Sequence, residues 1–447
     1  DNPYRTVERA MRRVREINAD MTADINVFLY DGIYRPDGTL EFTARDGGTN
    51  GCSVNYRALG SGAEISGGRS VSGWSRYSDK IWCADYRGGE YVRQLTVDGR
   101  SAVRAKSAEM TEIAAFYKDS GEAAAYDGLV LSDAKYAGYK NPQDIQIHTA
   151  SGWKSYLLNV EEIFADADGS RFKLPTESFS ECTDPENQHR IYPGWHVWIE
   201  NAFEELDEPG EFYYDRAAEK IYYYPREDEA IETAQVQAAS LEKLISINGA
   251  NYAEQAENIT FEGITLAHAA WARPSAAGLV NDQAQMMLPA AGDVCVAGGG
   301  GYSSVPSNIS ISNARGIVFE NNRVCDMGAV ALGLGGGVSD CVISGNTFCD
   351  IADSAITVGN MDIPFEDKVY SGRSLTPGGI ITASSTDGRN YPQNAVNGDV
   401  RSLWAPEGDG ACWWQIDLGS PQRIDRIELD GRYGSADDAG IYNISIY

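Results

Sequence analysis

The stretch Ile317–Asp326 (IVFENNRVCD) returns 24 residues later as Cys341–Asp350 (CVISGNTFCD). An earlier stretch, Ile259–His268 (ITFEGITLAH), shares part of the same pattern. A period in the low twenties, with short β-rich pieces separated by Asn or Gly, is typical of one coil of a parallel β-helix. The repeat therefore predicts stacked coils over this part of the chain.

Stacked coils turn a sequence repeat into a column of side chains about 4.8 Å apart. In this alignment His268 shares a position with Asp326 and Asp350, which end the two later repeats. The sequence thus predicts a polar column on one face of the stack. The repeat also aligns Cys325 with Cys349, which predicts either a disulfide or, as we favour, a ladder of two free thiols.

The composition points to a large, β-rich and acidic protein. The chain has 447 residues, 47 of them Gly and 25 Tyr, and this length and mix favour more than one structural unit with many turns. The net charge of −28 argues against binding to nucleic acid or to anionic membrane surfaces. No stretch approaches the roughly 20 apolar residues of a membrane span.

Along the chain, a helix at Tyr4–Ile17 with Thr6 as its N-cap precedes short strands. An insertion at about 106–200 follows, and Ser107–Asp119 reads as its more helical, charged part. A hairpin is expected at Phe212–Pro225, and coils from about 243 to 360. The last segment, Ile444–Tyr447, reads as an unfinished strand, so we expect a fragment of a longer polypeptide that a second polypeptide could complete.

Four motifs carry a resemblance that covers residues 1–360. They are PYRTVERAMRRVRE near the start, RQLTVDGRSAVRA at Arg93–Ala105, LDEPGEFYYDRAAEKIYYYP at Leu206–Pro225 and ITFEGITLAHAAWARPSAAGLVNDQAQ at Ile259–Gln285. With them the chain resembles bacterial right-handed parallel β-helix glycoside hydrolases, a superfamily that includes lacto-N-biosidases and some α-L-fucosidase or xylanase relatives. The resemblance implies a secreted or cell-surface enzyme with a pair of catalytic carboxyl groups.

A second resemblance covers residues 375–447. The segments Ile381–Trp404 (ITASSTDGRNYPQNAVNGDVRSLW) and Trp413–Gly419 (WWQIDLG) resemble the discoidin-like, F5/8 type C carbohydrate-binding module, a β-sandwich. The module looks cut short. The resemblance implies a structural Ca²⁺, for which the oxygen ligands would come from Asp387, Asn397 and Asp399. A module of degraded function that serves only as a spacer is the alternative.

The candidate catalytic residues are Asp326, Asp350 and Asp353, because glycoside cleavage usually needs two carboxyl groups on either side of the scissile bond. Two carboxylates on neighbouring coils repel, so one pKa should rise and supply a neutral acid. The alternative is a turn ladder in which Asp and Asn side chains bond the backbone at the corners. The candidate substrate-binding residues are His268, Trp271, Gln283 and Gln285, whose rings and amides suit sugar faces and hydroxyls.

We therefore expect an all-β chain, with a right-handed parallel β-helix catalytic domain at 1–365 and an incomplete discoidin-like β-sandwich module at 375–447. The expected function is extracellular glycoside hydrolysis without a catalytic cofactor, with release of a disaccharide from milk or mucin type-1 glycans as the specific form. The partner would be an oligosaccharide or polysaccharide. A polysaccharide lyase is one alternative, although the acidity of the chain opposes it. A non-catalytic glycan-binding adhesin is the other.

Overall fold

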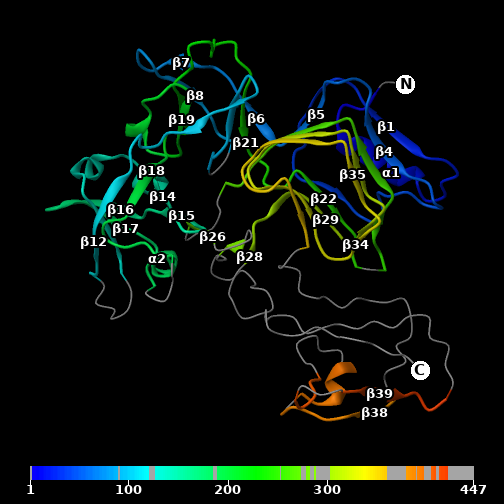
Figure 1. Ribbon diagram of the computed structural model, residues 1–447. Coiled ribbons are helices and arrows are strands. Elements are labelled where there is room, and N and C mark those ends of the chain that lie inside the picture. Colours follow the sequence, from blue (N-terminus) through cyan, green and yellow to red (C-terminus); the bar gives the residue numbers. More distant parts are fainter. Residues whose placement is uncertain are drawn as a thin grey trace. The chain divides into compact units, whose positions relative to one another are not determined.

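The structure is a computed structural model, and the chain in it divides into two compact units, Asp1–Cys295 with Gly301–Asp362, and Val296–Gly300 with Ile363–Tyr447. The described residues are 3–88, 91–119, 126–184, 189–251, 253–272, 278–281, 286–287, 303–359, 379–388, 390–396, 404–408 and 412–420. The described structure is mostly β (Figure 1). No helix among these residues is long and apolar enough to cross a bilayer.

The first unit opens with the helix α1 (Val7–Ile17), which confirms the helix expected from the sequence. The Thr6 side chain caps it by accepting a hydrogen bond from the Arg9 N–H at 3.2 Å. Val7, Met11 and Val14 lie on one face and are buried in the main hydrophobic core. The amphipathic spacing of these residues explains why the helix packs on the strands that follow.

Three parallel sheets of five strands each follow from successive passes of the chain (Figure 1). The first consists of β1 (Ile25–Leu29), β4 (Val54–Ala58), β24 (Ile259–Glu262), β31 (Val318–Glu320) and β35 (Val342–Ser344). The second consists of β2 (Gly32–Tyr34), β5 (Ala63–Ser66), β25 (Thr265–Ala269), β32 (Arg323–Met327) and β36 (Thr347–Ile351). The third consists of β3 (Leu40–Phe42), β22 (Ile245–Asn248), β29 (Ser307–Ser312), β33 (Val330–Leu334) and β37 (Ile356–Val358).

The register of these sheets follows the sequence repeat. Val324 pairs with Phe348 and Cys325 with Cys349, as the repeat predicts, and both cysteines are free thiols. Inside the stack, the Phe261 ring stacks on Phe319 with centroids 4.9 Å apart. At a corner, short strands form a further parallel sheet, β23 (Ala256–Glu257), β30 (Ala314–Arg315) and β34 (Val338–Ser339).

Asn322, which is buried, and Asn346, which is half-buried, close the same corner in two successive turns. The Asn322 Nδ2 donates to the Phe261 carbonyl at 2.9 Å, and the Ile264 N–H donates to the Asn322 Oδ1 at 2.9 Å. One turn later, the Asn346 Nδ2 donates to the Phe319 carbonyl at 2.8 Å. These amides satisfy backbone groups that the corner would otherwise leave unpaired in the interior.

Between β5 and β22 the chain leaves the three parallel sheets and builds antiparallel ones. A four-stranded sheet holds β6 (Gly68–Val71), β9 (Leu95–Val97), β10 (Arg100–Ser101) and β21 (Val236–Ala239). A five-stranded sheet holds β7 (Ser75–Arg76), β8 (Trp82–Asp85), β11 (Val103–Arg104), β19 (Glu211–Asp215) and β20 (Lys220–Tyr223), of which β11 and β19 are parallel. The strands β19 and β20 form the hairpin that the sequence predicts at Phe212–Pro225.

A ten-stranded sheet carries most of the insertion. Its strands are β12 (Thr111–Tyr117), β13 (Gly128–Leu131), β14 (Gln146–Ser151), β15 (Lys154–Asn159), β16 (Glu162–Asp166), β17 (Gly169–Lys173), β18 (His196–Glu200), β26 (Gly278–Asn281), β27 (Met286–Met287) and β28 (Ser303–Ser304). The helices α2 (Thr176–Thr183), η1 (Ala134–Gly138), η2 (Pro142–Asp144) and η3 (Phe203–Glu205) lie between strands of the insertion. The helical interpretation of Ser107–Asp119 is wrong, because β12 occupies this segment and pairs with β13 and β18.

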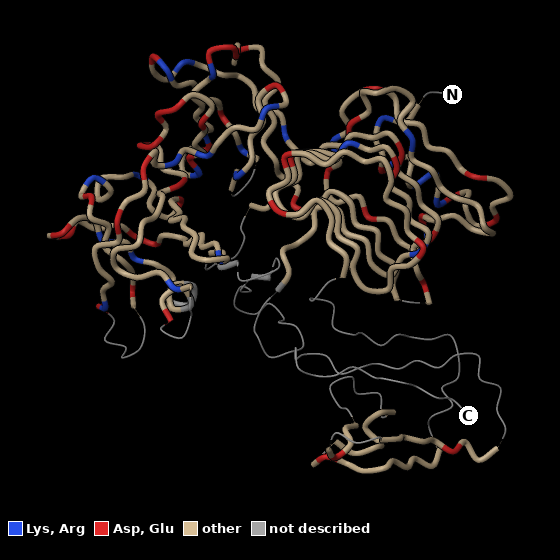
Figure 2. Tube along the Cα trace, viewed as in Figure 1, with Lys and Arg blue, Asp and Glu red and all other residues tan. Residues whose placement is uncertain are grey.

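Charges differ between these parts of the chain. Figure 2 shows acidic and basic residues interspersed along the antiparallel sheets, whereas the stacked turns of the parallel sheets are mostly uncharged.

In the second unit, β38 (Ile380–Ala383) and β39 (Trp414–Asp417) form an antiparallel pair, and η4 (Pro392–Val396) lies between them in sequence. The Trp414 indole N–H donates to the Pro392 carbonyl at 2.9 Å, which ties η4 to this pair.

Candidate functional site

The structure aligns His268, Asp326 and Asp350 in one column of the second parallel sheet. The residues before them pair across the three strands, Ala267 with Cys325 and Cys325 with Cys349. The residues after them pair as well, so the column falls between two ladder positions. All three have left-handed backbones, with φ of 58°, 52° and 51°. This conformation is uncommon for residues other than Gly, although Asn and Asp adopt it more readily than most.

The His268 ring is nearly enclosed, with 10% of its side chain exposed. Its Nδ1 lies 2.9 Å from the Ser66 Oγ and 3.4 Å from the Glu64 Oε1, both on β5. Its Nε2 lies 3.9 Å from the Asp326 Oδ2. The close packing needs Gly68, because a Cβ at that position would lie 2.8 Å from the His268 Cβ. The imidazole therefore sits between two carboxyl groups.

Asp326 is a buried carboxyl group, with 9% of the residue exposed. Burial raises its pKa, and the negative charge of Asp350 adds to this effect. The charge of His268 and hydrogen bonds from the Cys325 thiol and the Ser101 hydroxyl act in the opposite direction without cancelling it. The Ser101 Oγ donates to the Asp326 Oδ1 at 3.2 Å. A carboxyl group in this setting keeps its proton to a higher pH than an exposed Asp does.

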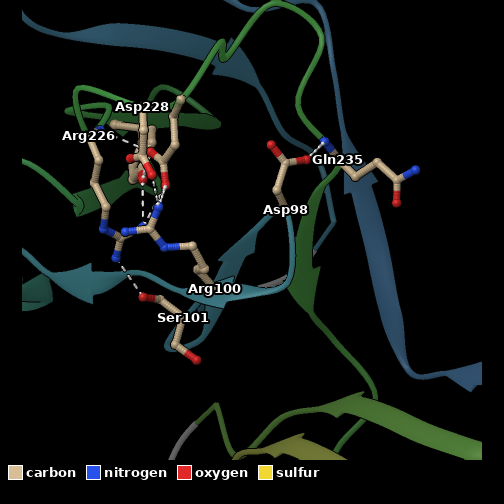
Figure 3. Close-up of polar contacts among 8 residues, drawn as sticks. Asp98, Arg100, Ser101, Arg226, Asp228 and Gln235 are labelled. Atoms are coloured by element: carbon tan, nitrogen blue, oxygen red, sulfur yellow. Dashed lines mark hydrogen bonds and ion pairs between the residues drawn. The ribbon is translucent and has the colours of Figure 1, made fainter.

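A hairpin in the antiparallel region presents Ser101 to the column. The strands β9 and β10 are joined by Asp98 and Gly99, both with positive φ (48° and 73°), which is the backbone of a tight two-residue hairpin. The Arg226 Nη2 donates to the Ser101 carbonyl at 2.7 Å, and the Arg100 Nη1 donates to the Asp228 Oδ2 at 2.7 Å. Figure 3 shows these contacts, with the Ser101 side chain pointing away from the arginines.

The other predicted catalytic residues lie on the same turn of the chain. Asp350 is exposed and belongs to β36, one strand beyond Asp326. Asp353 is half-buried and lies between β36 and β37. Neighbouring parallel strands are about 4.8 Å apart, so Asp326 and Asp350 are near neighbours. The structure thus brings a buried carboxyl group and an exposed one together.

The predicted substrate-binding residues divide into two groups. Trp271 is half-buried and packs against a small hydrophobic cluster of Val305, Ala329 and Val330, so packing accounts for part of its surface. Gln283 and Gln285 lie outside the described residues. Their role in hydroxyl recognition stays a prediction.

Two residues at the column were missed at the sequence level. Glu64 belongs to β5, where Thr265 of β25 is its partner, and its Oε1 is buried without a hydrogen-bond partner. Glu64 lies 201 residues before its partner Thr265 and so falls outside the short repeat, although EIS (64–66) occupies the place of TLA (265–267) in β25. Ser101 comes from the hairpin, and nothing in the repeat points to it.

The metal ligands predicted for the second unit are only partly described. Asp387 is described, and its N–H donates to the Ala405 carbonyl at 2.9 Å. Asn397 and Asp399 lie outside the described residues. In the described part of the chain, no group of three or more His, Cys, Asp or Glu side chains could hold a metal ion.

Comparison with known families adds two matches. Residues 79–226 match the model of the GH141 insertion domain. Residues 380–447 match the F5/8 type C domain. The first match covers β8 to β20, which are most of the antiparallel strands, and extends beyond the predicted insertion at about 106–200 on both sides. The second covers most of the segment that resembles a discoidin-like module. Together they support a glycosidase with a carbohydrate-binding module. No curated protein matches the chain.

One solved structure shows a similar fold. A structure described as "Glycoside hydrolase" is similar with a TM-score of 0.62 and 24% sequence identity, over 76% of this chain and 62% of the other. The chain thus spans about 62% of the length of that relative. A second structure, "The complex structure of XylC with xylose", aligns with a TM-score of 0.31 and 12% identity, over 75% of this chain and 39% of the other.

Proposed function

We propose that the protein is a glycoside hydrolase whose reaction takes place at the column of His268, Asp326 and Asp350. The observation that carries this proposal is the pair of carboxyl groups on β32 and β36, one buried with a raised pKa and one exposed. A carboxyl group that keeps its proton can protonate the glycosidic oxygen as the bond breaks. A solvent-facing carboxyl group beside it can attack the sugar or activate water.

Within this proposal, Asp326 is the general acid and Asp350 the nucleophile. Neighbouring strands are about 4.8 Å apart, which lies closer to the roughly 5–5.5 Å carboxyl separation of retaining enzymes than to the roughly 6.5–9.5 Å of inverting ones. Asp353, on the segment after β36, is the alternative partner for a longer separation. If Asp353 served as the base, water would attack directly and the product would be inverted.

His268 acts as a positioning residue for the acid in this proposal. Its Nε2 faces the Asp326 Oδ2 at 3.9 Å, while its Nδ1 lies within hydrogen-bond distance of the Ser66 Oγ at 2.9 Å and 3.4 Å from the Glu64 Oε1. The Ser66 contact orients the ring, and the ring in turn orients the Asp326 carboxyl group through the proximity of their charges. The Ser101 hydroxyl on the other carboxylate oxygen has the same effect.

The finer features rest on resemblance and on the sheet topology. The three parallel sheets, joined in cyclic order turn after turn, support a right-handed parallel β-helix as the fold of the catalytic domain at 1–365. The F5/8 type C match supports a discoidin-like β-sandwich at 375–447 that binds glycans outside the cell or at its surface. The motifs of the sequence support release of a disaccharide from type-1 glycans as the specific reaction. A structural Ca²⁺ at Asp387, Asn397 and Asp399 belongs to the same proposal.

Product analysis tests the proposed reaction. Wild-type protein and the variants Asp326→Asn and Asp350→Asn are incubated with milk, mucin and plant glycans, and the products are separated by chromatography. We expect the wild type to release a disaccharide. Asp326→Asn should lose about 10²–10⁴ in rate, the effect of a general acid, and Asp350→Asn should lose most of the activity because the nucleophile is removed. Asn tolerates the left-handed backbone, so the folds should be retained.

Asp340→Asn is the matched control, because Asp340 also has a left-handed backbone (φ 54°) but pairs with the exposed Arg315 at 2.8 Å. This variant should keep full activity. Cleavage that survives in Asp326→Asn and Asp350→Asn would move the reaction away from the column. Unsaturated products absorbing in the ultraviolet would identify a lyase, and binding without any cleavage would identify a glycan-binding protein.

A further inference from the structure

A polar cavity is lined mainly by residues of the antiparallel sheets. It has a volume of about 270 Å³. Its wall includes Tyr91, Arg93, Arg104, Gln146, Asn159 and Arg216. These residues come from the segment before β9, from β11, β14 and β15, and from the turn after β19. Ligand pockets typically measure about 300–1,000 Å³, so this cavity suits a single sugar residue better than an extended chain.

Arg93 and Arg104, in the wall of the cavity, have fewer carboxylate partners than they have positive charges. The Arg104 Nη1 donates to the Gln146 Oε1 at 2.8 Å and lies 3.4 Å from the Glu200 Oε2. The Arg93 Nη1 donates to the same Gln146 oxygen at 3.3 Å. Among the described residues, no carboxylate lies within ion-pair distance of Arg93. The Arg104 Nε is buried without a hydrogen-bond partner.

Glu200 cannot serve both arginines, because His148 also engages it. The His148 Nδ1 lies 2.8 Å from the Glu200 Oε1. Burial acts to raise the pKa of Glu200, but the hydrogen bond to His148 and the charges of Arg104, His148 and Arg93 outweigh it and bring the pKa to about 2. Glu200 therefore contacts His148 and Arg104 and reaches Arg93 only through longer-range attraction, and burial destabilises the charged form of Arg93 and of Arg104.

The remaining wall suits the hydroxyl groups of a sugar. The Gln146 Nε2 donates to the Asn159 Oδ1 at 2.8 Å, which fixes both amides at the wall. The Asn201 Oδ1 is buried without a hydrogen-bond partner, and Asn201 also lines the cavity. The third arginine, Arg216, is already engaged by Asp144 and stacks over the Tyr91 ring at 4.4 Å. Unsatisfied donors and acceptors thus gather around Arg93 and Arg104.

We propose that this cavity binds the carboxylate of an acidic sugar, a uronic acid residue, through Arg93 and Arg104. Guanidinium groups present planar forks of N–H donors that match a carboxylate, and charge-assisted bonds of this kind are the strong ones. The bound carboxylate supplies the anion that the arginine pair lacks, while the amides contact ring hydroxyls. The site rests on its own residues and is independent of the proposed hydrolysis.

Isothermal titration of the full chain with sodium glucuronate, glucose and sodium sulfate at matched ionic strength tests this site. We expect saturable binding of glucuronate and none of glucose. Arg93→Gln and Arg104→Gln should weaken glucuronate binding about tenfold or more, which is the effect of losing one hydrogen bond between charged groups. Arg87→Gln is the matched control, because Arg87 is 81% exposed and pairs with Glu219 at the surface.

The unfolding temperature of the protein without ligand distinguishes a binding role of Arg93 from a structural one. Removing a buried charge that lacks a partner should leave the unfolding temperature of Arg93→Gln unchanged or higher, whereas a structural arginine would lower it. Asp350→Asn should bind glucuronate as the wild type does, so loss of hydrolysis and loss of this site are told apart. Equal binding of glucose and glucuronate, unchanged binding by Arg93→Gln, or binding of sulfate alone would each overturn the proposal.

Discussion

The buried amide of Asn322 is the sharpest test of the stacked turns. Its side chain, 2% exposed, accepts from the Ile264 N–H and donates to the Phe261 carbonyl, both at 2.9 Å. Asn322→Ala would leave one N–H and one C=O inside the stack without partners. Each such group costs about 1–3 kcal/mol, so we expect the free energy of unfolding to fall by roughly 2–5 kcal/mol.

Asn346→Ala is the matched variant one turn later. Asn346 donates to the Phe319 carbonyl at 2.8 Å and accepts from the Asn322 N–H at 2.9 Å, but it is half-buried. Water can replace these bonds at a half-buried position, so the expected loss is about 1 kcal/mol. Urea unfolding followed by far-ultraviolet circular dichroism measures both. Equal losses in the two variants, or a loss below about 1 kcal/mol in Asn322→Ala, would refute the buried ladder.

Three further outcomes follow from the same contacts. Ser101→Ala removes a hydrogen bond that lowers the pKa of Asp326, so that pKa should rise. The basic limb of the pH profile of kcat/KM should then move to higher pH. A basic limb at the wild-type pH would contradict the contact. Burial raises the pKa of Asp326 in the folded protein, so the fold favours the protonated carboxyl group. This contribution to the free energy of unfolding is fully present below the pKa of the unfolded chain, about 3.9. It is lost as the pH rises through the pKa of the folded protein. Asp326→Asn should therefore gain in unfolding temperature, relative to wild type, between acidic and neutral pH, and a constant difference would contradict the raised pKa. Phe261→Ala should cost about 3–5 kcal/mol in urea unfolding, since this ring stacks between Tyr56 and Phe319 with centroids 5.5 Å and 4.9 Å away, and a cost under 1 kcal/mol would contradict the packing.

The parts of the fold that repeat could be predicted from sequence. A 24-residue period predicts which residues stack on one another. The pairing of Val324 with Phe348 and the column of Asp326 and Asp350 follow from this period. The helix at the start was also predictable, because its apolar spacing and its Thr6 cap are local signals.

The parts that depend on distant partners could not be predicted. Ser101 bonds Asp326 across 225 residues of sequence, and a hairpin that is not part of the repeat brings it there. The segment Ser107–Asp119 carries a charged, helix-like composition, yet Thr111–Tyr117 within it forms a strand because β13 and β18 pair with it. Tertiary pairing of this kind overrides local propensity. The position of Glu64 could not be predicted, because the whole insertion separates its strand, β5, from the strand β25 that pairs with it.

Leaving-group dependence tests the central claim most directly. The kcat/KM of Asp326→Asn is compared with that of the wild type on a natural glycan and on an aryl glycoside of the same sugar, whose phenolate leaves without protonation. If Asp326 is the general acid, the variant should lose about 10²–10⁴ on the glycan and far less on the aryl glycoside, whereas Asp350→Asn should lose activity on both. Equal losses of Asp326→Asn on the two substrates, or full activity on the glycan, would contradict the assignment.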